Sequence, residues 1–376
     1  MSGFLQKDPP MYKFIPHLRN ILFFCFLNVL IVLDVHSDDT QNLQDLINQN
    51  ITDRTSLKLE QDKIYHISNG LIINGPLEID GNGSFIILDC YVNDINSMAN
   101  KNMIFIRGVP DEKIKNITIK NLNLDQNLEE DNNNFPNHPL CFRSHWRSMA
   151  NMTENAGKGR AIKVAYANNV TIKDVVINNT YIGLEFADGT SDATALRVNV
   201  NNVVEDGFEV TINIDFDNPI SPKYITLDDT HVKSVIGFDS GFEIEASKNV
   251  TVINSSVNNC GGPRSSGVDG DGVFLKLTHI GTRALPIINN DITIKNFCSR
   301  VKSGNQSISI EHGKNIKIID NAILNGQFEI RDWSDIHIIG NYFGTAPEVE
   351  EICMSLPLQS LPQESIFRNI NCSELR

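Results

Sequence analysis

The sequence carries little positive charge for its length. Lys and Arg number 32 against 46 Asp and Glu, which gives a net charge of −14. Binding to nucleic acid needs a basic face, so this balance argues against a nucleic-acid partner. No Cys-x-x-Cys motif occurs among the seven cysteines, which argues against a zinc or thiol-redox site. The chain also lacks an apolar run of the roughly 20 residues that span a bilayer comfortably.

The longest apolar run is short and lies near the N-terminus. Residues 21–33 (ILFFCFLNVLIVL) contain a single polar residue and follow a segment with Lys, His and Arg. Their length fits the apolar region of a signal peptide, and Val35 and Ser37 suit a cleavage site after Ser37. We therefore expect residues 1–37 to be a signal peptide, or else an uncleaved anchor that attaches the protein to a membrane. In both cases the remaining chain would be secreted or displayed at the cell surface.

Six cysteines remain outside this apolar segment. An even number in an exported chain allows disulfides, although scattered buried thiols are an equal alternative. We expect residues 346–376 to form a C-terminal tail or cap. Within it, we expect Cys353 and Cys372 to form a disulfide.

A four-residue motif, Asn-Val-Thr-Ile or a close variant, recurs along the chain. Its copies begin at Asn116, Asn169, Asn249, Asp291, Asn315 and Asp335, and the closest copies are about 20 to 27 residues apart. A short strand that returns at this period is typical of a solenoid. Several copies are also glycosylation sequons, but we favour the interpretation that the Asn residues form turns.

A second set of strands precedes these repeats. Its members alternate apolar and polar residues behind a small residue, which is the period of a strand with one buried face. A shorter third strand follows several repeats. Three strands per coil predict an all-β fold, a single-stranded right-handed parallel β-helix over residues 38–345, with a capping helix over 39–47. The strands of the first set are expected at 161–164, 183–186, 207–210, 241–245, 272–276, 307–311 and 327–331.

The N-terminal helix, the segment Leu77-Glu78-Ile79-Asp80-Gly81-Asn82-Gly83 and the repeats together resemble the pectate lyase and polygalacturonase superfamily. The resemblance covers about Asp38 to Phe343. It implies the pectin-lyase-like β-helix and a polysaccharide that lies along the face of the first strand set. This fold hosts lyases, hydrolases, epimerases and adhesins, so the resemblance alone selects no activity.

Four insertions flank the first strand set, at residues 127–159, 213–222, 260–270 and 278–290. Long loops beside a flat strand face make a groove, where binding sites are common. Residues 136–147 (PNHPLCFRSHWR) within the first insertion offer Arg143, Trp146 and Arg147. Trp stacks on sugar rings and Arg pairs with carboxylates, so we expect these residues to bind substrate unless the loop only packs on the solenoid.

The face between these loops carries a ladder of outward side chains. Its first column is predicted as Lys163, Glu185, Glu209, Glu243, Phe274, Ser309 and Glu329, and its second column includes Glu245, Lys276, Glu311 and Arg331. Lys276 could instead belong to the first column. Carboxylates on adjacent rungs lie about 4.8 Å apart, so a cation, a basic neighbour, a raised pKa or solvent must offset their repulsion. We expect Glu209 and Arg331 to contact substrate.

Three functions fit this ladder. A glycosidase would use a pair of carboxyl groups, either Glu243 with Glu245 or Asp239 with Asp271. A lyase or epimerase for an acidic polysaccharide would hold Ca²⁺ at Asp239, Glu243 and Glu245, with Lys276 as one candidate base. A non-catalytic surface or adhesive protein would carry the same glutamates as a solvated face. In each case we expect the partner to be an extracellular polysaccharide.

Overall fold

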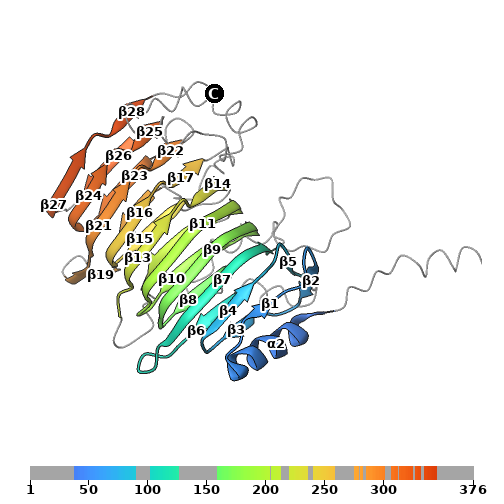
Figure 1. Ribbon diagram of the computed structural model, residues 1–376. Helices are drawn as coiled ribbons and strands as arrows, with labels where there is room; N and C mark the ends of the chain where they lie inside the picture. Colours follow the sequence, from blue (N-terminus) through green and yellow to red (C-terminus); the bar gives the residue numbers. More distant parts are fainter. Residues whose placement is uncertain are drawn as a thin grey trace, which may run out of the picture. The chain divides into compact units, whose positions relative to one another are not determined.

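The structure is a computed structural model in which one helix is followed along the chain by stacked, mostly parallel strands (Figure 1). The described residues all lie in one compact unit, Asp38–Arg376. The described ranges are 38–89, 102–126, 159–203, 205–212, 220–235, 240–258, 275–278, 280–282, 285–300, 306–311, 313–324, 327–331 and 334–344. No helix within these ranges is long and apolar enough to cross a membrane. The predicted export segment, Cys353 and Cys372 lie outside them.

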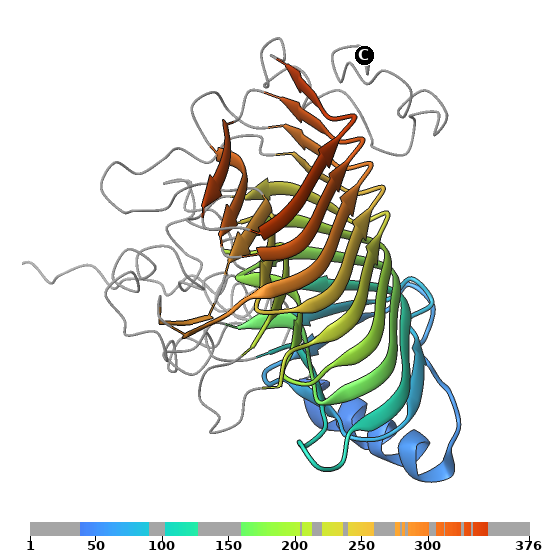
Figure 2. The same cartoon turned by 90° about the vertical axis from the view of Figure 1, so that its left-hand side faces the viewer.

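Two parallel sheets form the solenoid, and Figure 2 shows successive coils side by side in chain order. The nine-stranded sheet begins with two strands that were not predicted as members of the first set, β3 (Leu71–Ile73) and β6 (Ile104–Arg107). It continues with the strands of the predicted first set: β8 (Arg160–Ala165), β10 (Ile182–Ala187), β12 (Phe208–Thr211), β15 (Phe242–Glu245), β18 (Leu275–Thr278), β23 (Gln306–Glu311) and β26 (Gln327–Arg331). Its strands pair in this order, one rung per coil.

The 17-stranded sheet contains the repeats and the third strands. Three of its strands are long because they continue around a corner of the coil, namely β7 (Ile114–Asp125), β9 (Ala167–Thr180) and β11 (Ser191–Val203). The others are β1 (Leu57–Lys58), β2 (Ile64–Ile67), β4 (Leu77–Asp80), β5 (Phe85–Leu88), β13 (Lys223–Asp228), β14 (His231–Val235), β16 (Lys248–Ile253), β17 (Ser256–Asn258), β21 (Asn289–Lys295), β22 (Cys298–Arg300), β24 (Gly313–Ile319), β25 (Ala322–Leu324), β27 (Ser334–Ile339) and β28 (Tyr342–Gly344).

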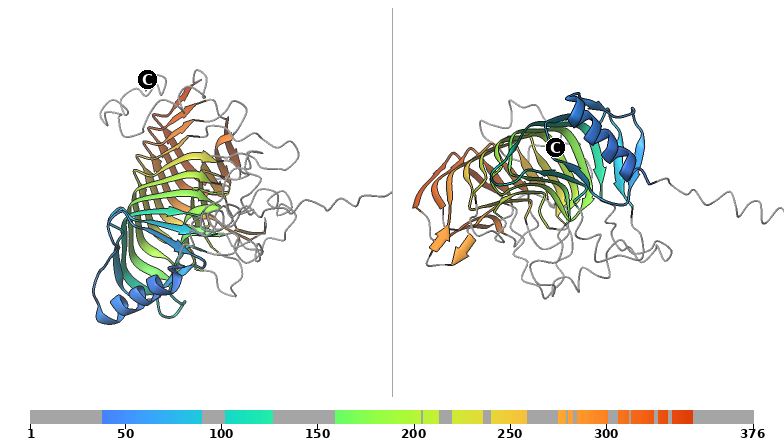
Figure 3. Two further views of the ribbon diagram at one scale, coloured as in Figure 1. Left: turned by 90° about the vertical axis from the view of Figure 1, so that its right-hand side faces the viewer. Right: turned by 90° about the horizontal axis from the view of Figure 1, so that it is seen from below.

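Part of the predicted loop 278–290 is itself ordered as strands. β19 (Ile280–Thr282) and β20 (Leu285–Ile287) pair in antiparallel fashion and form a small hairpin outside the two parallel sheets (Figure 3). The fold is thus the predicted right-handed parallel β-helix, with one added hairpin between β18 and β21.

The helix α2 (Thr40–Asp53) covers the first coil, as predicted for the capping helix. Leu43 and Ile47 are buried against the strands, which closes the apolar interior at this end. Asp39 occupies the position before the helix, but its carboxylate makes no cap bond to the helix. It accepts a hydrogen bond from the backbone N–H of His66 instead, so this side chain attaches the helix to β2.

The interior of the coils is apolar and stacked in register. Phe208 and Phe242 occupy the same position on neighbouring strands, and their ring centroids lie 4.9 Å apart. The Phe242 ring meets Phe297 edge to face. All three side chains are fully buried in the single large core cluster. Aromatic pairs in these geometries add to the stability that burial provides, so this column supports the coils that carry the candidate site.

The Asn of the repeat is a turn residue. Asn116, Asn169, Asn249 and Asn315 all have positive φ, between 51° and 61°. Asn tolerates this left-handed conformation better than other residues with a Cβ, because its short polar side chain bonds locally. The Asn169 amide donates to the Asn116 carbonyl oxygen at 2.7 Å, and the Asn315 amide donates to Asp291. The sequence interpretation of these residues as turn formers is confirmed.

We expect Asn169→Ala to be less stable than Asn169→Gly by about 1 kcal/mol. Both variants lose the amide bond to Asn116, so their difference isolates the cost of a Cβ at φ 55°. Denaturant unfolding of the two variants measures this difference. Equal stability would contradict the turn as the source of the Asn preference.

One predicted strand is shifted. The sequence pattern places a strand at 272–276, whereas β18 is Leu275–Thr278. Lys276 consequently pairs with Glu243 and Ser309 in the first column, and Phe274 lies outside the described residues. A shift of two residues leaves every side chain on the same face of a strand, so alternation in the sequence could not detect it.

Candidate active site

Strand pairing confirms the predicted column of the nine-stranded sheet except at one rung, where Lys276 stands in place of Phe274. The column runs Phe105, Lys163, Glu185, Glu209, Glu243, Lys276, Ser309 and Glu329. Glu185, Glu209 and Glu243 in this column are largely shielded from solvent, however. Glu185 is 0% exposed and Glu243 is 4% exposed. Burial of charged groups is costly unless they are paired or neutralised, so the environment of each one determines its charge.

Glu185 is held between two cations. The Arg160 guanidinium contacts its Oε2 atom, and the Lys163 Nζ atom lies 3.0 Å from its Oε1 atom. Burial raises the pKa of Glu185, but the charges of Arg160 and Lys163 outweigh this effect and hold the pKa below its usual range. Glu185 is therefore the ionised centre of a buried ion-pair network.

Glu209 lies one rung further along the stack and has the opposite character. Its Oε2 atom is 3.7 Å from Arg160, whose closer carboxylate is Glu185. Burial raises the pKa of Glu209 well above its usual range, and the negative charge of Glu185 raises it further, while Arg160 acts in the opposite direction. The pKa values of these two neighbouring glutamates are therefore shifted in opposite directions, with that of Glu185 lowered and that of Glu209 raised.

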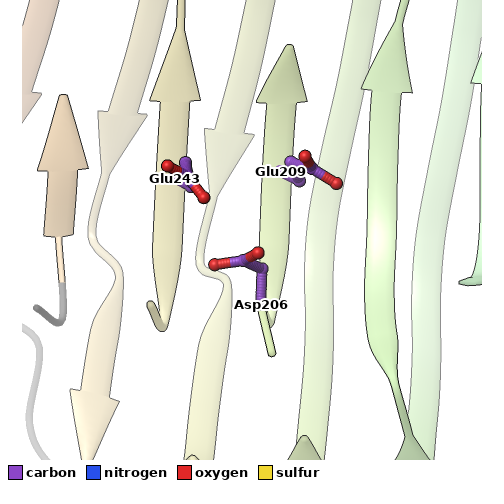
Figure 4. A group of neighbouring side chains, drawn as sticks. All are labelled: Asp206, Glu209 and Glu243. Atoms are coloured by element: carbon purple, nitrogen blue, oxygen red, sulfur yellow. The ribbon is translucent and has the colours of Figure 1, made fainter. Parts of the chain in front are cut away.

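Three carboxyl groups gather around Glu209. One oxygen each of Asp206, Glu209 and Glu243 lies within 4.8 Å of the others. Figure 4 shows Asp206 just before the strand that carries Glu209, and Glu243 on the neighbouring strand. We call these three residues the carboxylate cluster. Glu209 is its most accessible member, because 12% of its side chain is exposed.

The backbone around the cluster is tightly packed. The Asp206 carboxylate accepts a hydrogen bond from the Ser240 backbone N–H at 3.0 Å, which fixes it against the next coil. A Cβ at Gly207 would lie 2.3 Å from a methyl group of Val232, and one at Gly183 would lie 2.3 Å from the Gly207 carbonyl oxygen. Glycine at 183 and 207 is therefore required for the close approach of these coils, and Gly207 directly follows Asp206.

The comparisons identify the fold. No protein-family model and no curated protein matches the sequence. The endo-xylogalacturonan hydrolase of Aspergillus tubingensis has a similar structure, with a TM-score of 0.50 and 10% identity over 84% of this chain and 91% of the hydrolase. The protein has the pectin-lyase-like fold. The Streptococcus pneumoniae adhesin PfbA is 12% identical with a TM-score of 0.44, over 82% of this chain and 96% of PfbA.

Within this pectin-lyase-like fold, the structure describes where some of the predicted site residues lie. Glu243 and Glu209 meet in the carboxylate cluster. Glu245 does not join the cluster, and its carboxylate accepts a hydrogen bond from Thr211 at 2.6 Å. Two carboxylates along one strand are about 7 Å apart, whereas those on adjacent rungs are about 4.8 Å apart, so pairing across rungs is the closer arrangement.

The remaining predicted residues cannot be placed as side chains. Asp239 and Asp271, which were predicted as catalytic, lie outside the described residues. The predicted substrate-binding residues Arg143, Trp146 and Arg147 also lie outside them. Only the backbone is described at Lys276, in β18, and at Arg331, in β26.

Sequence reasoning missed Arg160. This residue directly precedes the first apolar position of β8, and its register partner on the next strand is Ile182. Its side chain nevertheless reaches Glu185 and Glu209, one and two rungs away. The strand pattern contained no signal for this contact, because it predicted neither the burial of the glutamates nor the reach of the Arg160 side chain.

Proposed function

We propose that this protein is a carbohydrate-active β-helix protein that cleaves glycosidic bonds in an extracellular polysaccharide, with Glu209 as the proton donor. The observation that supports this proposal is the raised pKa of Glu209 within 4.8 Å of two further carboxyl groups. Glycosidases combine one protonated and one ionised carboxyl group beside the scissile bond. The predicted export segment at residues 1–37 agrees with an extracellular substrate and remains part of the proposal.

The expected chemistry assigns one task to each group. Protonated Glu209 donates its proton to the glycosidic oxygen, and the bond from that oxygen to the sugar carbon breaks. The carboxylate of Glu243, on the next rung, bonds to that sugar carbon as the first bond breaks. Water then displaces Glu243 from the sugar and gives its proton to Glu209, which restores both groups. A separation of at most 4.8 Å between their closest oxygens is nearer to the spacing of about 5 Å in retaining enzymes than to the 6.5–9.5 Å of inverting ones. Retention of the anomeric configuration is therefore expected.

A second candidate function is favoured by the oxygen geometry of the carboxylate cluster. Ca²⁺ binds carboxylate oxygens at about 2.3 to 2.6 Å, so oxygens within 4.8 Å of one another can share one ion. Asp206, Glu209 and Glu243 would hold it, in place of the predicted set Asp239, Glu243 and Glu245. The ion would neutralise the carboxylate of an acidic sugar, as a lyase or epimerase requires. Binding would need Glu209 in its ionised form.

Product analysis separates these functions. The secreted protein is incubated with pectate, alginate and neutral plant polysaccharides, with Ca²⁺ or with a chelator. New reducing ends without unsaturated sugars, in the presence of the chelator, are the result expected for the hydrolase. Unsaturated products that form only with Ca²⁺ would show that the protein is a lyase instead. A change of sugar configuration that requires Ca²⁺ would show that it is an epimerase. Binding without any turnover would leave the non-catalytic surface protein.

A further inference from the structure

A second polar surface lies on the 17-stranded sheet, over the Asn-Val-Thr-Ile strands. A groove of about 540 Å³ crosses β13, β16, β21 and β24. We call it the threonine groove, and it is lined by Tyr224, Thr226, Asn249, Thr251, Asp291, Thr293, Asn315 and Lys317. Strand pairing arranges these residues in two columns with one rung per coil. The groove therefore runs along the stack of coils.

The lining matches the hydrogen-bonding groups of a sugar chain. Thr226, Thr251 and Thr293 occupy equivalent positions on consecutive rungs, which are about 4.8 Å apart. Hydroxyl and amide groups both donate and accept hydrogen bonds, as sugar hydroxyls do. Tyr224 is 52% exposed at one end of the groove and offers an aromatic face for stacking. Its ring lies 5.7 Å from the Lys223 Nζ atom.

A column of lysines directly precedes the lining column of Tyr224, Asn249 and Asn315 along the strands, although the protein is acidic overall. Lys223 and Lys248 are register partners on adjacent rungs, and the same column continues through Asn290 to Lys314. All three lysines are exposed, and Lys317 adds a further charge inside the groove. Asp291 is the one acidic residue of the lining, and it accepts a hydrogen bond from Asn315 at 2.6 Å. Lysines on adjacent rungs repel one another, so an anion between them is favoured.

We infer that the threonine groove binds a linear anionic polysaccharide that runs along the stack of coils. The lysine column pairs with its carboxylate or sulfate groups, the threonine and asparagine columns bond its hydroxyls, and Tyr224 stacks on one sugar ring. This inference deepens the proposed function, because it places a chain-binding surface on a different sheet from the carboxylate cluster. It uses none of the cluster residues, so the two can fail separately.

Binding of the full chain to polygalacturonate, alginate and chondroitin sulfate tests this inference, because these polymers present carboxylate or sulfate. We expect at least one polymer to bind at low salt and to be released as salt rises. If polygalacturonate binds, fully esterified pectin should bind much more weakly, because it lacks the negative charge. Failure of all three anionic polymers, or stronger binding of single-stranded DNA than of any of them, overturns the inference.

Matched lysine variants localise the binding. The double variant Lys248→Gln/Lys314→Gln is expected to bind the polymer about tenfold more weakly. The double variant Lys58→Gln/Lys233→Gln changes the net charge equally at exposed positions outside the groove, and its affinity should stay close to that of the parent protein. Equal losses in both variants would overturn the inference. Cleavage of short oligosaccharides, which depends on Glu209, should be the same in both double variants. A failure of the proposed function can therefore be distinguished from a failure of polymer binding in the groove.

Discussion

Replacing Glu185 by Gln is expected to lower the free energy of unfolding by about 3 to 5 kcal/mol. The Glu185 carboxylate is fully buried and contacts both Arg160 and Lys163. Gln keeps the shape of the side chain but removes its charge, so two cations lose their counter-charge in a buried site. Removal of one partner from a buried ion pair is costly because the desolvation of the other partner is no longer offset.

The matched control for this variant is Asp174→Asn. Asp174 accepts hydrogen bonds from Arg197, and the two side chains are 33% and 44% exposed respectively. Exposed ion pairs contribute little to stability, so we expect almost no change. Denaturant unfolding of the two variants provides the measurement. A loss below about 1 kcal/mol for Glu185→Gln would contradict the buried network.

The pH dependence of the Glu185 contribution follows from its lowered pKa. A carboxyl group with a pKa that is lower in the folded state contributes stability above the unfolded pKa. That stability is lost as the pH falls through the folded pKa. The difference in stability between the parent protein and Glu185→Gln should therefore shrink in acid. A constant difference across the acid range would show that charge is not its cause.

Much of the fold could be predicted from the sequence, because a solenoid repeats its local rules. A left-handed turn before the repeat strand recurs from coil to coil, formed by Asn or Asp in most coils and by Tyr224 in one. Because the same pattern recurs, each coil can be checked against its neighbours. The exception was β18, where alternation allowed a shift of two residues. There the positions of Lys276 and Phe274 could not be decided, because pattern period alone determines the face and not the register.

The candidate site was less predictable because it depends on reach and burial. The column with Glu185, Glu209 and Glu243 followed from the strand pattern, but its burial did not. The long side chain of Arg160 reaches glutamates on the next two rungs of the sheet. The periodicity of the sequence does not predict how far a side chain reaches. The prediction paired Glu243 with Glu245 along one strand, whereas the structure brings Glu243 to Glu209 and Asp206. Contacts across coils dominate in this fold because the rung spacing is shorter than two residues of a strand.

Replacing Glu209 by Gln is expected to remove the proposed glycosidase activity, with a loss of about 100- to 10,000-fold in kcat. Gln cannot donate the proton that the leaving oxygen needs. In the parent protein, activity should fall as the pH rises through the raised pKa of Glu209, since only the protonated form is the acid. Glu78→Gln is the control, because Glu78 is exposed on β4 and bonds Lys120 outside the nine-stranded sheet. Unchanged activity in Glu209→Gln would remove Glu209 from the mechanism.

The same variant should be more stable than the parent protein at neutral and alkaline pH. A carboxyl group with a pKa that is raised in the folded state contributes stability below its unfolded pKa, and this is lost as the pH rises through the folded pKa. Gln stays neutral throughout, so the gain in stability should grow as the pH rises from the unfolded pKa of Glu through the raised pKa of folded Glu209. Unfolding over that range, compared with Glu78→Gln, measures the effect. If the gain in stability increases with pH while activity is lost, the ionisable group of Glu209 lowers the stability of the parent protein but supports its activity. A residue with a purely structural role would not lower stability in this way.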